Sequence, residues 1–163
     1  MRERFAIRQP TAADAGAIAS VHVDGWRDTY GHLLPERFYD HKVLAQRTAM
    51  WTSLLSRIVV PPRLFVADSD GQVVGFAYAG PSEEPDSVRA LTLHSLYVRS
   101  QLHGRGIGQG LLEAAVHDDP TQLWVAKDNS RARTFYCRNG FVLDGNEKID
   151  HDADDLVEVR LVR

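Results

Sequence analysis

A glycine-rich stretch between an apolar strand and an apolar helix constrains this chain more than any other part of it. The stretch runs from Arg89 to His117, and glycine occupies every second position between residues 104 and 110. Residues Leu91 to Val98 are apolar and often β-branched, which predicts a buried strand. Residues Ile107 to Val116 place their apolar side chains on one helical face, which predicts a helix. Because glycine lacks a Cβ, the turn between them lets backbone amides approach a ligand closely.

The position of these amides predicts an anion site. Amides at a helix start lack intrahelical partners and the helix dipole adds positive charge, so the arrangement favours a phosphate. Two common nucleotide motifs do not fit. Walker A requires Lys-Ser or Lys-Thr after a glycine, and neither pair occurs here. The fingerprint GxGxxG fails in three registers because its last position holds Gln109, Leu111 or Glu113.

Two segments carry a family resemblance. The window His103 to Gly108 resembles motif A of the GNAT superfamily of acyl-CoA-dependent N-acyltransferases, which reads Gln/Arg-x-x-Gly-x-Gly/Ala. Both glycine positions match, and His103 stands where Gln or Arg is usual. The segment Asn129 to Phe141 is close to a second family signature, N-x-x-A-x-x-F-Y-x-x-x-G-F. The segment Trp26 to Tyr30, followed by Leu-Leu-Pro, is similar to the acceptor-side helix of members that act on small molecules.

The other elements follow from hydrophobic periodicity and from capping and turn residues. A capping box from Thr11 to Asp14 precedes the first helix, and Gly80 to Ser87 is expected to be a mobile loop. Further helices are expected at Lys42–Ser56 and Arg131–Arg138, and strands at Arg4–Arg8, Leu64–Ala67, Val73–Ala79, Leu123–Ala126, Phe141–Leu143 and Leu156–Val162.

This order resembles the GNAT fold over essentially the whole chain. The expected class is α/β, with a mixed, mostly antiparallel sheet of about seven strands and four helices. The resemblance implies that the sheet splays between its fourth and fifth strands. With 163 residues and 44% hydrophobic content, the chain fits a single domain spanning residues 1–163.

Composition narrows the partners. A net charge of −3 gives no general attraction to nucleic acid or to an anionic membrane. No apolar run approaches the ~20 residues of a membrane span, and the first ten residues lack the apolar core of a signal peptide. The single cysteine, Cys137, excludes an intrachain disulfide, is interpreted as structural, and fits a reducing cytoplasm. We therefore expect a cytoplasmic protein without nucleic-acid or membrane partners.

The resemblance implies acetyl-CoA as a co-substrate. Backbone groups of Leu96 to Val98 would bind the pantetheine arm, and the amide near Leu96 would polarise the thioester carbonyl. Amides of His103 to Gly108 would bind the pyrophosphate. Arg105, and as weaker candidates Arg99 and Arg133, would pair with phosphate oxygens. The implied cofactor set is Leu96, Tyr97, Val98, His103, Gly104, Arg105, Gly106, Ile107, Gly108, Asn129 and Tyr136.

Two proton transfers are needed. Tyr136 matches the family tyrosine that protonates the coenzyme A thiolate. Many relatives carry a glutamate base near the position of Thr92, and threonine cannot act as a base. His94 lies two residues on, on the same strand face, and imidazole suits proton abstraction near neutral pH. His22 and a water relay are alternatives. No HExxH motif or clustered His, Cys and Asp spacing argues for a metal.

Acceptor residues are less constrained. Trp26, Tyr30 and Tyr78 are candidates to line a pocket, although aromatic residues at such spacings also build cores. The acidic run Asp150 to Asp155 is either a solvated loop or a feature that attracts a cationic amine. The sequence therefore predicts a transferase that moves an acetyl group from acetyl-CoA to a small-molecule amine. A non-catalytic acyl-CoA-binding module and a protein or peptide N-acetyltransferase are alternatives, and a homodimer is left open.

Overall fold

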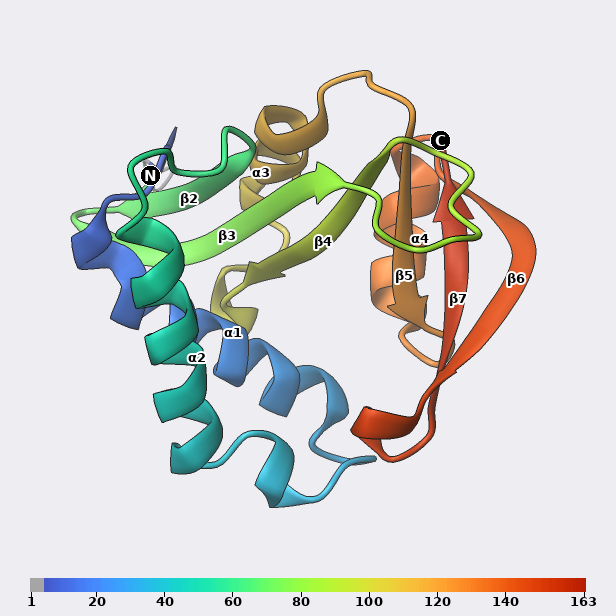
Figure 1. Cartoon of the computed structure of the whole chain (residues 1–163), viewed down its shortest axis with the longest axis horizontal. Coiled ribbons are helices and arrows are strands. Elements are labelled where there is room, and N and C mark those ends of the chain that lie inside the picture. The colour runs from blue at the N-terminus through green and yellow to red at the C-terminus, as the bar shows by residue number, and fades with distance from the viewer. Residues whose placement is uncertain (1–4) are drawn as a thin grey trace. The chain divides into compact units, whose positions relative to one another are not determined.

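The computed structural model describes residues 5–163, which form two compact units (Figure 1). The first unit comprises Met1–Ala79, described from residue 5, together with Ser95–His117. The second unit comprises Gly80–His94 and Asp118–Arg163. The strand β4 (Leu91–Val98) begins in the second unit and ends in the first.

In the described part of the chain, seven strands form one sheet in the order β1-β2-β3-β4-β5-β7-β6. Strands β4 and β5 are parallel, whereas β1 with β2, β2 with β3, β5 with β7 and β6 with β7 are antiparallel. The other strands are β1 (Ala6–Arg8), β2 (Leu64–Ser69), β3 (Gln72–Pro81), β5 (Thr121–Ala126), β6 (Val142–Asp150) and β7 (Leu156–Val162). The α-helices are α1 (Ala15–Tyr30), α2 (His41–Leu55), α3 (Ile107–Val116) and α4 (Ser130–Arg138), with short 3-10 turns η1 (Ala12–Asp14), η2 (Glu36–Phe38), η3 (Ser100–Leu102) and η4 (His151–Ala153).

The predicted α/β class, seven strands and four helices are confirmed in the described residues, and most of the predicted element boundaries differ by a residue or more. The first strand begins at Ala6, and Arg4 of its predicted range lies outside the described residues. Strand β3 extends to Pro81. Strand β6 runs to Asp150 instead of ending at Leu143, because a register shift between Leu143 and Glu147 interrupts the alternation without ending the pairing with β7.

The start of α1 is fixed by charge. The backbone amide of Thr11 donates to Asp14 Oδ2 at 2.7 Å, as the predicted capping box requires. Arg8 on β1 donates to both carboxylate oxygens of Asp14, at 2.8 and 3.0 Å, and also bonds Asp68 on β2. The hydrogen bond from Arg8 lowers the pKa of Asp14 to about 2, against the opposing effect of its burial.

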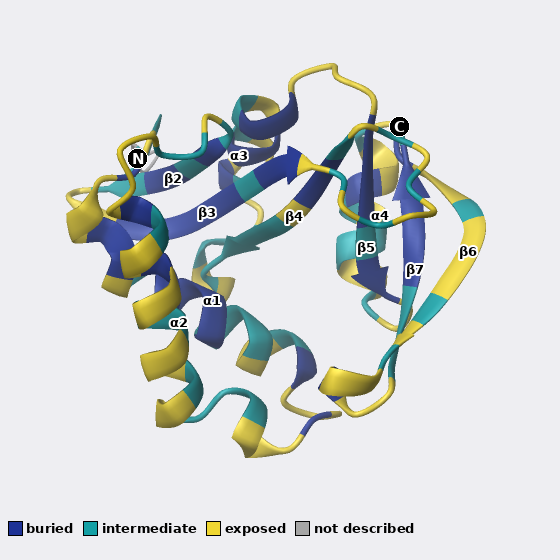
Figure 2. Cartoon of the chain, in the orientation of Figure 1, coloured by how far each residue is buried: buried dark blue, intermediate teal, exposed yellow. Residues whose placement is uncertain are grey.

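The core of the first unit lies between two helices and one face of β2 and β3. Leu64 and Val66 on β2 pair with Tyr78 and Phe76 on β3, so all four share that face. Figure 2 shows β2 and β3 buried over most of their length, whereas much of α2 is exposed. The buried cluster is Ala15, Ile18, Ala19 and Val21 of α1, Trp51 and Leu55 of α2, and Leu64, Val66, Val73 and Phe76 of the strands.

Two glycines permit close approaches in this unit. Gly75 of β3 faces away from Phe76, and a Cβ there would lie 3.1 Å from the Leu111 side chain of α3. Helix α3 therefore covers the face opposite α1 and α2. Gly25 of α1 lies against Tyr97 of β4, where an added Cβ would come within 2.5 Å of the ring.

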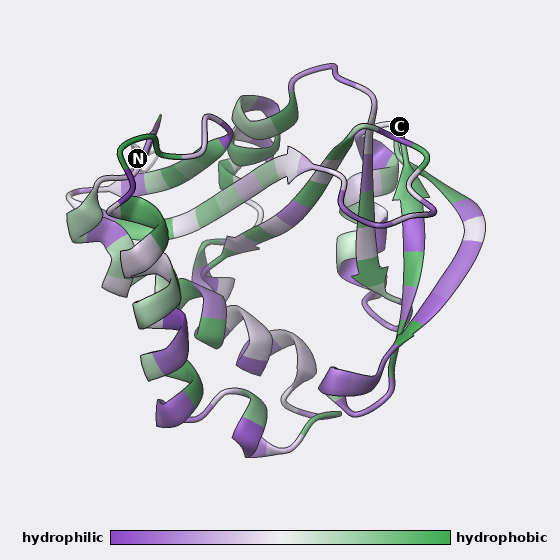
Figure 3. Ribbon diagram, viewed as in Figure 1, coloured by the Kyte–Doolittle hydropathy of each residue, from purple (hydrophilic) through white to green (hydrophobic). Residues whose placement is uncertain are grey.

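The second unit buries both faces of its central strand. Leu123 and Val125 of β5 are buried on one face, and Gln122 is buried on the other with Trp124 beside it. Arg160 of β7, opposite Trp124, is only 3% exposed. Figure 3 shows that β6 and the β3–β4 loop are mostly hydrophilic. This loop was expected to be mobile, and instead it forms the hydrogen bonds to β5, β6 and β7 described below.

Matched glycine substitutions in α1 test the packing of β4. Gly25→Ala forces the Tyr97 ring to move, so we expect a loss of about 1–3 kcal/mol in the free energy of unfolding. Gly16→Ala, where a Cβ meets nothing within 4 Å, should gain about 0.5–1 kcal/mol from helix propensity. Urea unfolding monitored by circular dichroism measures both changes. An equal increase in the free energy of unfolding of the two variants would show that α1 is not packed tightly against Tyr97.

Candidate active site

The glycine turn joins β4 to α3 in the first unit. Gly104 and Gly106 have φ of 78° and 85°, a left-handed conformation that glycine adopts readily. A Cβ at either position meets nothing within 4 Å, so the backbone conformation and not steric space requires glycine there. Gly108 and Gly110 lie inside α3, and Gly110 packs near Ile7 of β1. The four glycines therefore have two distinct roles.

The turn presents amides at the start of α3. Gly106 is the N-cap, and the first intrahelical bond of α3 runs from Gly110 N to Gly106 O at 3.0 Å. The amides of Ile107, Gly108 and Gln109 precede this bond and point along the helix axis. Partial positive charge at this end of a ten-residue helix favours an anion. Arg105, which is exposed in the same turn, adds a full positive charge.

His103 ties the turn to β4. Its Nε2 lies 2.8 Å from the carbonyl oxygen of Val98, which can only accept, so Nε2 carries the proton. The imidazole thus links the last residue of β4 to the first residue of the motif A window. His103 therefore supplies a side-chain N–H donor at the position where the family motif has Gln or Arg.

The two weaker arginine candidates have partners within the protein. Arg99 donates to Asp24 Oδ2 at 2.8 Å and to Ser20 Oγ at 3.3 Å, so its charge is balanced by α1. Arg133 donates to the carbonyl oxygen of Lys127 at 2.8 Å. The structure thus places Arg99 and Arg133 in contacts with α1 and with the residues before α4, and Arg105 in the glycine turn itself.

The acceptor candidates of the first unit differ in exposure. Trp26 is half-buried and its ring contacts that of Tyr30 edge to face, with centroids 4.9 Å apart. Tyr30 is only 8% exposed, which places most of its ring in the core. Tyr78 is half-buried and packs against the core cluster. Trp26 and Tyr78 therefore keep more surface available to a ligand than Tyr30 does.

His22 is not the general base. It is 7% exposed and lies among the rings of Phe76, Tyr97 and Trp51, at centroid distances of 5.6, 5.0 and 6.3 Å. Burial, with a smaller contribution from the charge of Arg47, lowers the pKa of His22 to about 3. A base this weak, enclosed by aromatic rings, does not remove a proton from an amine at neutral pH.

The second family segment forms α4 and its flanks in the second unit. Asn129 caps the helix, because its Oδ1 accepts the Ala132 amide at 3.1 Å. Tyr136 is 8% exposed, and its ring packs edge to face on Phe135 and Phe141 at 5.2 and 5.7 Å. Helix α4 ends before Gly140, which has a φ of 84°. The signature thus specifies helix caps and aromatic packing as well as the residues proposed for catalysis.

Thr92 and His94 have different environments on β4. Thr92 is 8% exposed, and its hydroxyl lies 2.6 Å from Ser82 Oγ. His94 is exposed, and its role as a base stays a prediction. Between these positions the pairing of β4 with β5 ends: in the described part of the chain it consists of Leu91 with Thr121 and Thr92 with Gln122.

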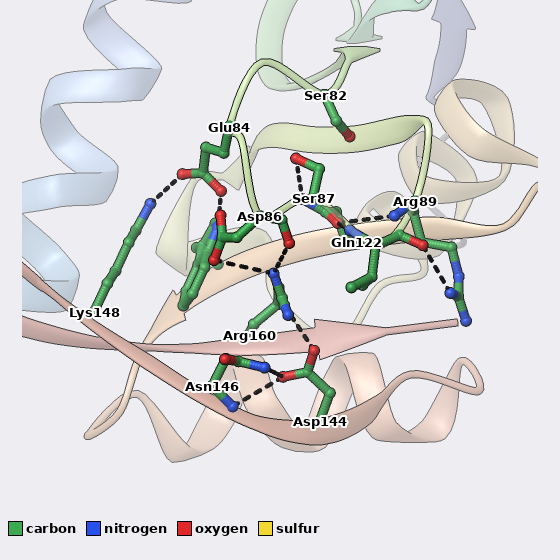
Figure 4. A network of polar contacts seen from close by, with 12 residues as sticks. Ser82, Glu84, Asp86, Ser87, Arg89, Gln122, Asp144, Asn146, Lys148 and Arg160 are labelled. Carbon is green, nitrogen blue, oxygen red and sulfur yellow. Dashed lines mark hydrogen bonds and ion pairs between the residues drawn. The ribbon is translucent and has the colours of Figure 1, made fainter.

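Sequence reasoning missed a polar network in the second unit (Figure 4). Glu84 accepts hydrogen bonds from Trp124 Nε1 at 2.6 Å and from Lys148 Nζ at 2.7 Å. Burial opposes ionisation of Glu84, and the hydrogen bonds from Lys148 and Trp124 outweigh it and lower its pKa. Burial raises the pKa of Glu158, because Lys148, 3.6 Å away, offsets it only in part. The available signals were Gln122 and Arg160, polar residues inside otherwise apolar strands.

The acidic run is partly used within its own turn. Asp150 Oδ1 accepts the amides of Asp152 and Ala153 at 3.1 and 3.2 Å, which caps η4. Asp155 pairs with His151 at 2.6 Å.

Within residues 5–163, no group of three His, Cys, Asp or Glu side chains is arranged to hold a metal ion. No described helix is both long and apolar enough to cross a membrane.

Residues 61–143 match the family model described as "Acetyltransferase (GNAT) domain". A probable N-acetyltransferase of Mycobacterium tuberculosis is 29% identical over 146 residues, which cover 85% of this chain and 80% of that protein. The L-methionine sulfoximine/L-methionine sulfone acetyltransferase of Pseudomonas aeruginosa is 36% identical over 145 residues, covering 85% and 81%.

Solved structures share the fold. The PaiA N-acetyltransferase of Thermoplasma acidophilum, solved with coenzyme A, aligns with a TM-score of 0.72 at 17% identity and covers 96% of this chain and 98% of its own. An N-acetyltransferase of Staphylococcus aureus aligns with the same TM-score at 17% identity, covering 97% and 100%. At these identities the likeness concerns the fold alone.

The burial of His22 predicts a pH-dependent stability. Burial lowers the pKa of His22 from its ordinary value of 6.5 to about 3 in the folded protein. Below pH 6.5 the unfolded chain therefore binds a proton that the folded chain does not. The free energy of unfolding should therefore fall by about 1.4 kcal/mol per pH unit from this group as pH drops from 6.5 toward 3.

Denaturant unfolding of the wild type and of His22→Phe between pH 7.5 and 4.5 measures this slope. The free energy of unfolding of the wild type minus that of His22→Phe should fall as the pH falls, because only the wild type has an imidazole at this position that the unfolded chain protonates. His32→Gln, at an exposed position, is the control and should keep the wild-type slope. A constant difference for His22→Phe would contradict a buried neutral imidazole.

Proposed function

Because the chain belongs to the GNAT acetyltransferase family, we propose that it transfers an acetyl group from acetyl-CoA to the amine of a small molecule. The observation that carries the proposal is the turn at Gly104 and Gly106, which presents the first amides of α3 for an anion directly after β4. The diphosphate of coenzyme A is such an anion. An acyltransferase of this family needs that site whichever amine it uses.

The proposal assigns the backbone of Leu96 to Val98 to the pantetheine arm. An extended ligand can bind a strand as an added strand does, through backbone amide and carbonyl groups. The amide near Leu96 would also donate to the thioester oxygen as negative charge develops there. One such donor typically contributes about 2.7–4 kcal/mol of transition-state stabilisation.

Proton transfer is assigned to two side chains. Tyr136 would protonate the departing thiolate, and the rings of Phe135 and Phe141 hold its phenol in one orientation. His94 would take the proton of the amine, since Thr92 cannot and His22 is enclosed. A pH profile of kcat/KM that is unchanged in His94→Gln would reject His94 as the base.

The name of one relative supports a choice of acceptor class. The Pseudomonas aeruginosa relative is named for methionine sulfoximine and methionine sulfone, which are small amino-acid derivatives. We therefore propose an α-amino acid derivative or a similar small amine as acceptor, with Trp26 as a contact and Tyr30 and Tyr78 supporting it. Arg105 and the amides of His103 to Gly108 would bind the phosphates.

A binding and turnover experiment tests the function. Acetyl-CoA at 100 times its Kd should stabilise the protein by about 2.7 kcal/mol, seen as a raised Tm. Gly108→Glu puts a carboxylate at the helix start and should abolish that shift, whereas Gln46→Glu adds the same charge at an exposed position of α2 and should keep it. Free thiol released with a panel of amines then measures turnover.

Each result separates one candidate function. No change of Tm with millimolar acetyl-CoA or coenzyme A would exclude both the enzyme and a non-catalytic acyl-CoA-binding module. A raised Tm without thiol release from any amine or peptide would favour the binding module. Release with a peptide but not with small amines would favour protein acetylation.

Removing one phenol tests the catalytic acid. Tyr136→Phe keeps the ring and its packing, so the Kd for acetyl-CoA should be unchanged while kcat falls by roughly 10²-fold. Tyr39→Phe, which removes a phenol bonded to the Leu34 carbonyl in the first unit, is the control and should keep the wild-type kcat. An unchanged kcat in Tyr136→Phe would assign the proton to water or to another group.

A further inference from the structure

Within the second unit, side chains from β5, β6 and β7 hold the β3–β4 loop in place. The strap, defined here as residues Ser82 to Arg89, lies over the Gln122 face of β5 (Figure 4). Glu84 of the strap bonds Trp124 and Lys148, and Arg160 donates to the carbonyl oxygen of Asp86 at 2.8 Å. The strap is therefore a bonded layer on this face of the sheet.

Gln122 is the buried centre of these contacts. Its side chain is fully buried, and its Oε1 accepts the backbone amides of Val88 at 2.8 Å and Arg89 at 3.1 Å. Its Nε2 donates to Ser87 Oγ at 3.2 Å. One side-chain amide thus bonds three consecutive residues of the strap. Because Gln122 is excluded from water, each of these bonds is costly to lose.

These bonds act immediately before β4 begins. Val88 and Arg89 precede Leu91 by two to three residues, and the backbone of Gln122 pairs with Thr92. The Ser82–Thr92 hydroxyl contact and the bond from Arg89 Nε to Arg163 O, at 2.9 Å, fix both ends of the strap. A parallel ladder of two residue pairs is weak alone, so the side chain of Gln122 supplies the register that the short ladder cannot.

We propose that Gln122 is a positioning residue that fixes where β4 starts on β5. It thereby sets the residue at which β4 leaves the ladder and becomes able to bind the pantetheine arm of acetyl-CoA. This role rests on the proposed function, because it concerns the same cofactor. Gln122 does not contact the reacting atoms; it acts through Val88, Arg89 and the first residues of β4.

Amide exchange and acetyl-CoA binding test the role in the full-length protein. Gln122→Met keeps the length of the side chain and removes its acceptor and donor. The Val88 and Arg89 amides should then exchange with solvent about tenfold faster, and the Kd and KM for acetyl-CoA should rise about tenfold, the equivalent of one lost buried hydrogen bond. The KM for the amine and the kcat at saturating acetyl-CoA should stay within about twofold of wild type.

Two further variants separate this role from general destabilisation. Thr121→Val is the matched control, since Thr121 is the adjacent, equally buried residue and, among residues 5–163, its hydroxyl bonds only the Asp119 carbonyl. It should leave exchange at Val88 and Arg89 and the Kd for acetyl-CoA unchanged. Gln122→Glu should restore both in part, because its carboxyl group, protonated or ionised, can accept the Val88 and Arg89 amides as the side-chain amide does.

The outcomes decide between the proposals. The role is overturned if Gln122→Met leaves amide exchange unchanged, or if it raises the Kd no more than Thr121→Val does. If Gln122→Met does not fold, Ser87→Ala is the substitute, because it removes only the acceptor of Gln122 Nε2. Changes in amide exchange and in Kd of about half the size on a logarithmic scale would support the role, and the absence of any change would overturn it. Wild-type protein that fails to bind acetyl-CoA would overturn the proposed function itself.

Discussion

The shortness of the parallel ladder between β4 and β5 is the constraint on which the rest of the structure depends. The ladder consists of two residue pairs in the described part of the chain, while β5 continues to pair with β7 along Gln122 to Ala126. Beyond that ladder β4 is held by its other neighbour, β3, and by side-chain contacts. Tyr97 supplies one by packing on α1 at Gly25, and His103 supplies another by bonding the Val98 carbonyl. Early separation is also what would make the backbone of β4 available to an extended ligand.

Local sequence signals predicted the parts of the site that depend on local geometry. The turn before α3 was predictable from Gly104 and Gly106, which adopt a left-handed conformation there, and a cap of α4 from the polar run Asp128 to Ser130, of which Asn129 accepts the Ala132 amide. The strap was not predictable in the same way. Glu84 and Lys148 are 64 positions apart, and prolines with acidic residues describe a solvated loop as well as a bonded one. Its order comes from tertiary hydrogen bonds that no short sequence window contains.

The two histidine candidates show why residue type alone could not choose a base. His22 and His94 have the same intrinsic basicity, and the sequence places both on elements expected near the site. The environment separates them: His22 lies among three aromatic rings, and its burial, with a smaller effect of Arg47, lowers its pKa to about 3, whereas His94 is exposed. The spacing of Ile18, Val21 and His22 along α1 places His22 on the buried face of this helix. It could not show that aromatic side chains from three other elements would close around it.

The two departures from the family motifs have structural explanations, and this bears on the choice between enzyme and binding module. His103 replaces Gln or Arg with another side-chain N–H donor, which bonds Val98. Thr92 occupies a buried position under the strap, where its hydroxyl is satisfied by Ser82. A glutamate there would displace that contact and bury a carboxylate beside Gln122, whose own oxygen already accepts two amides. The strap therefore excludes the usual base from this position. The absence of glutamate at residue 92 fits the way β4 is anchored and is therefore no argument that catalysis has been lost.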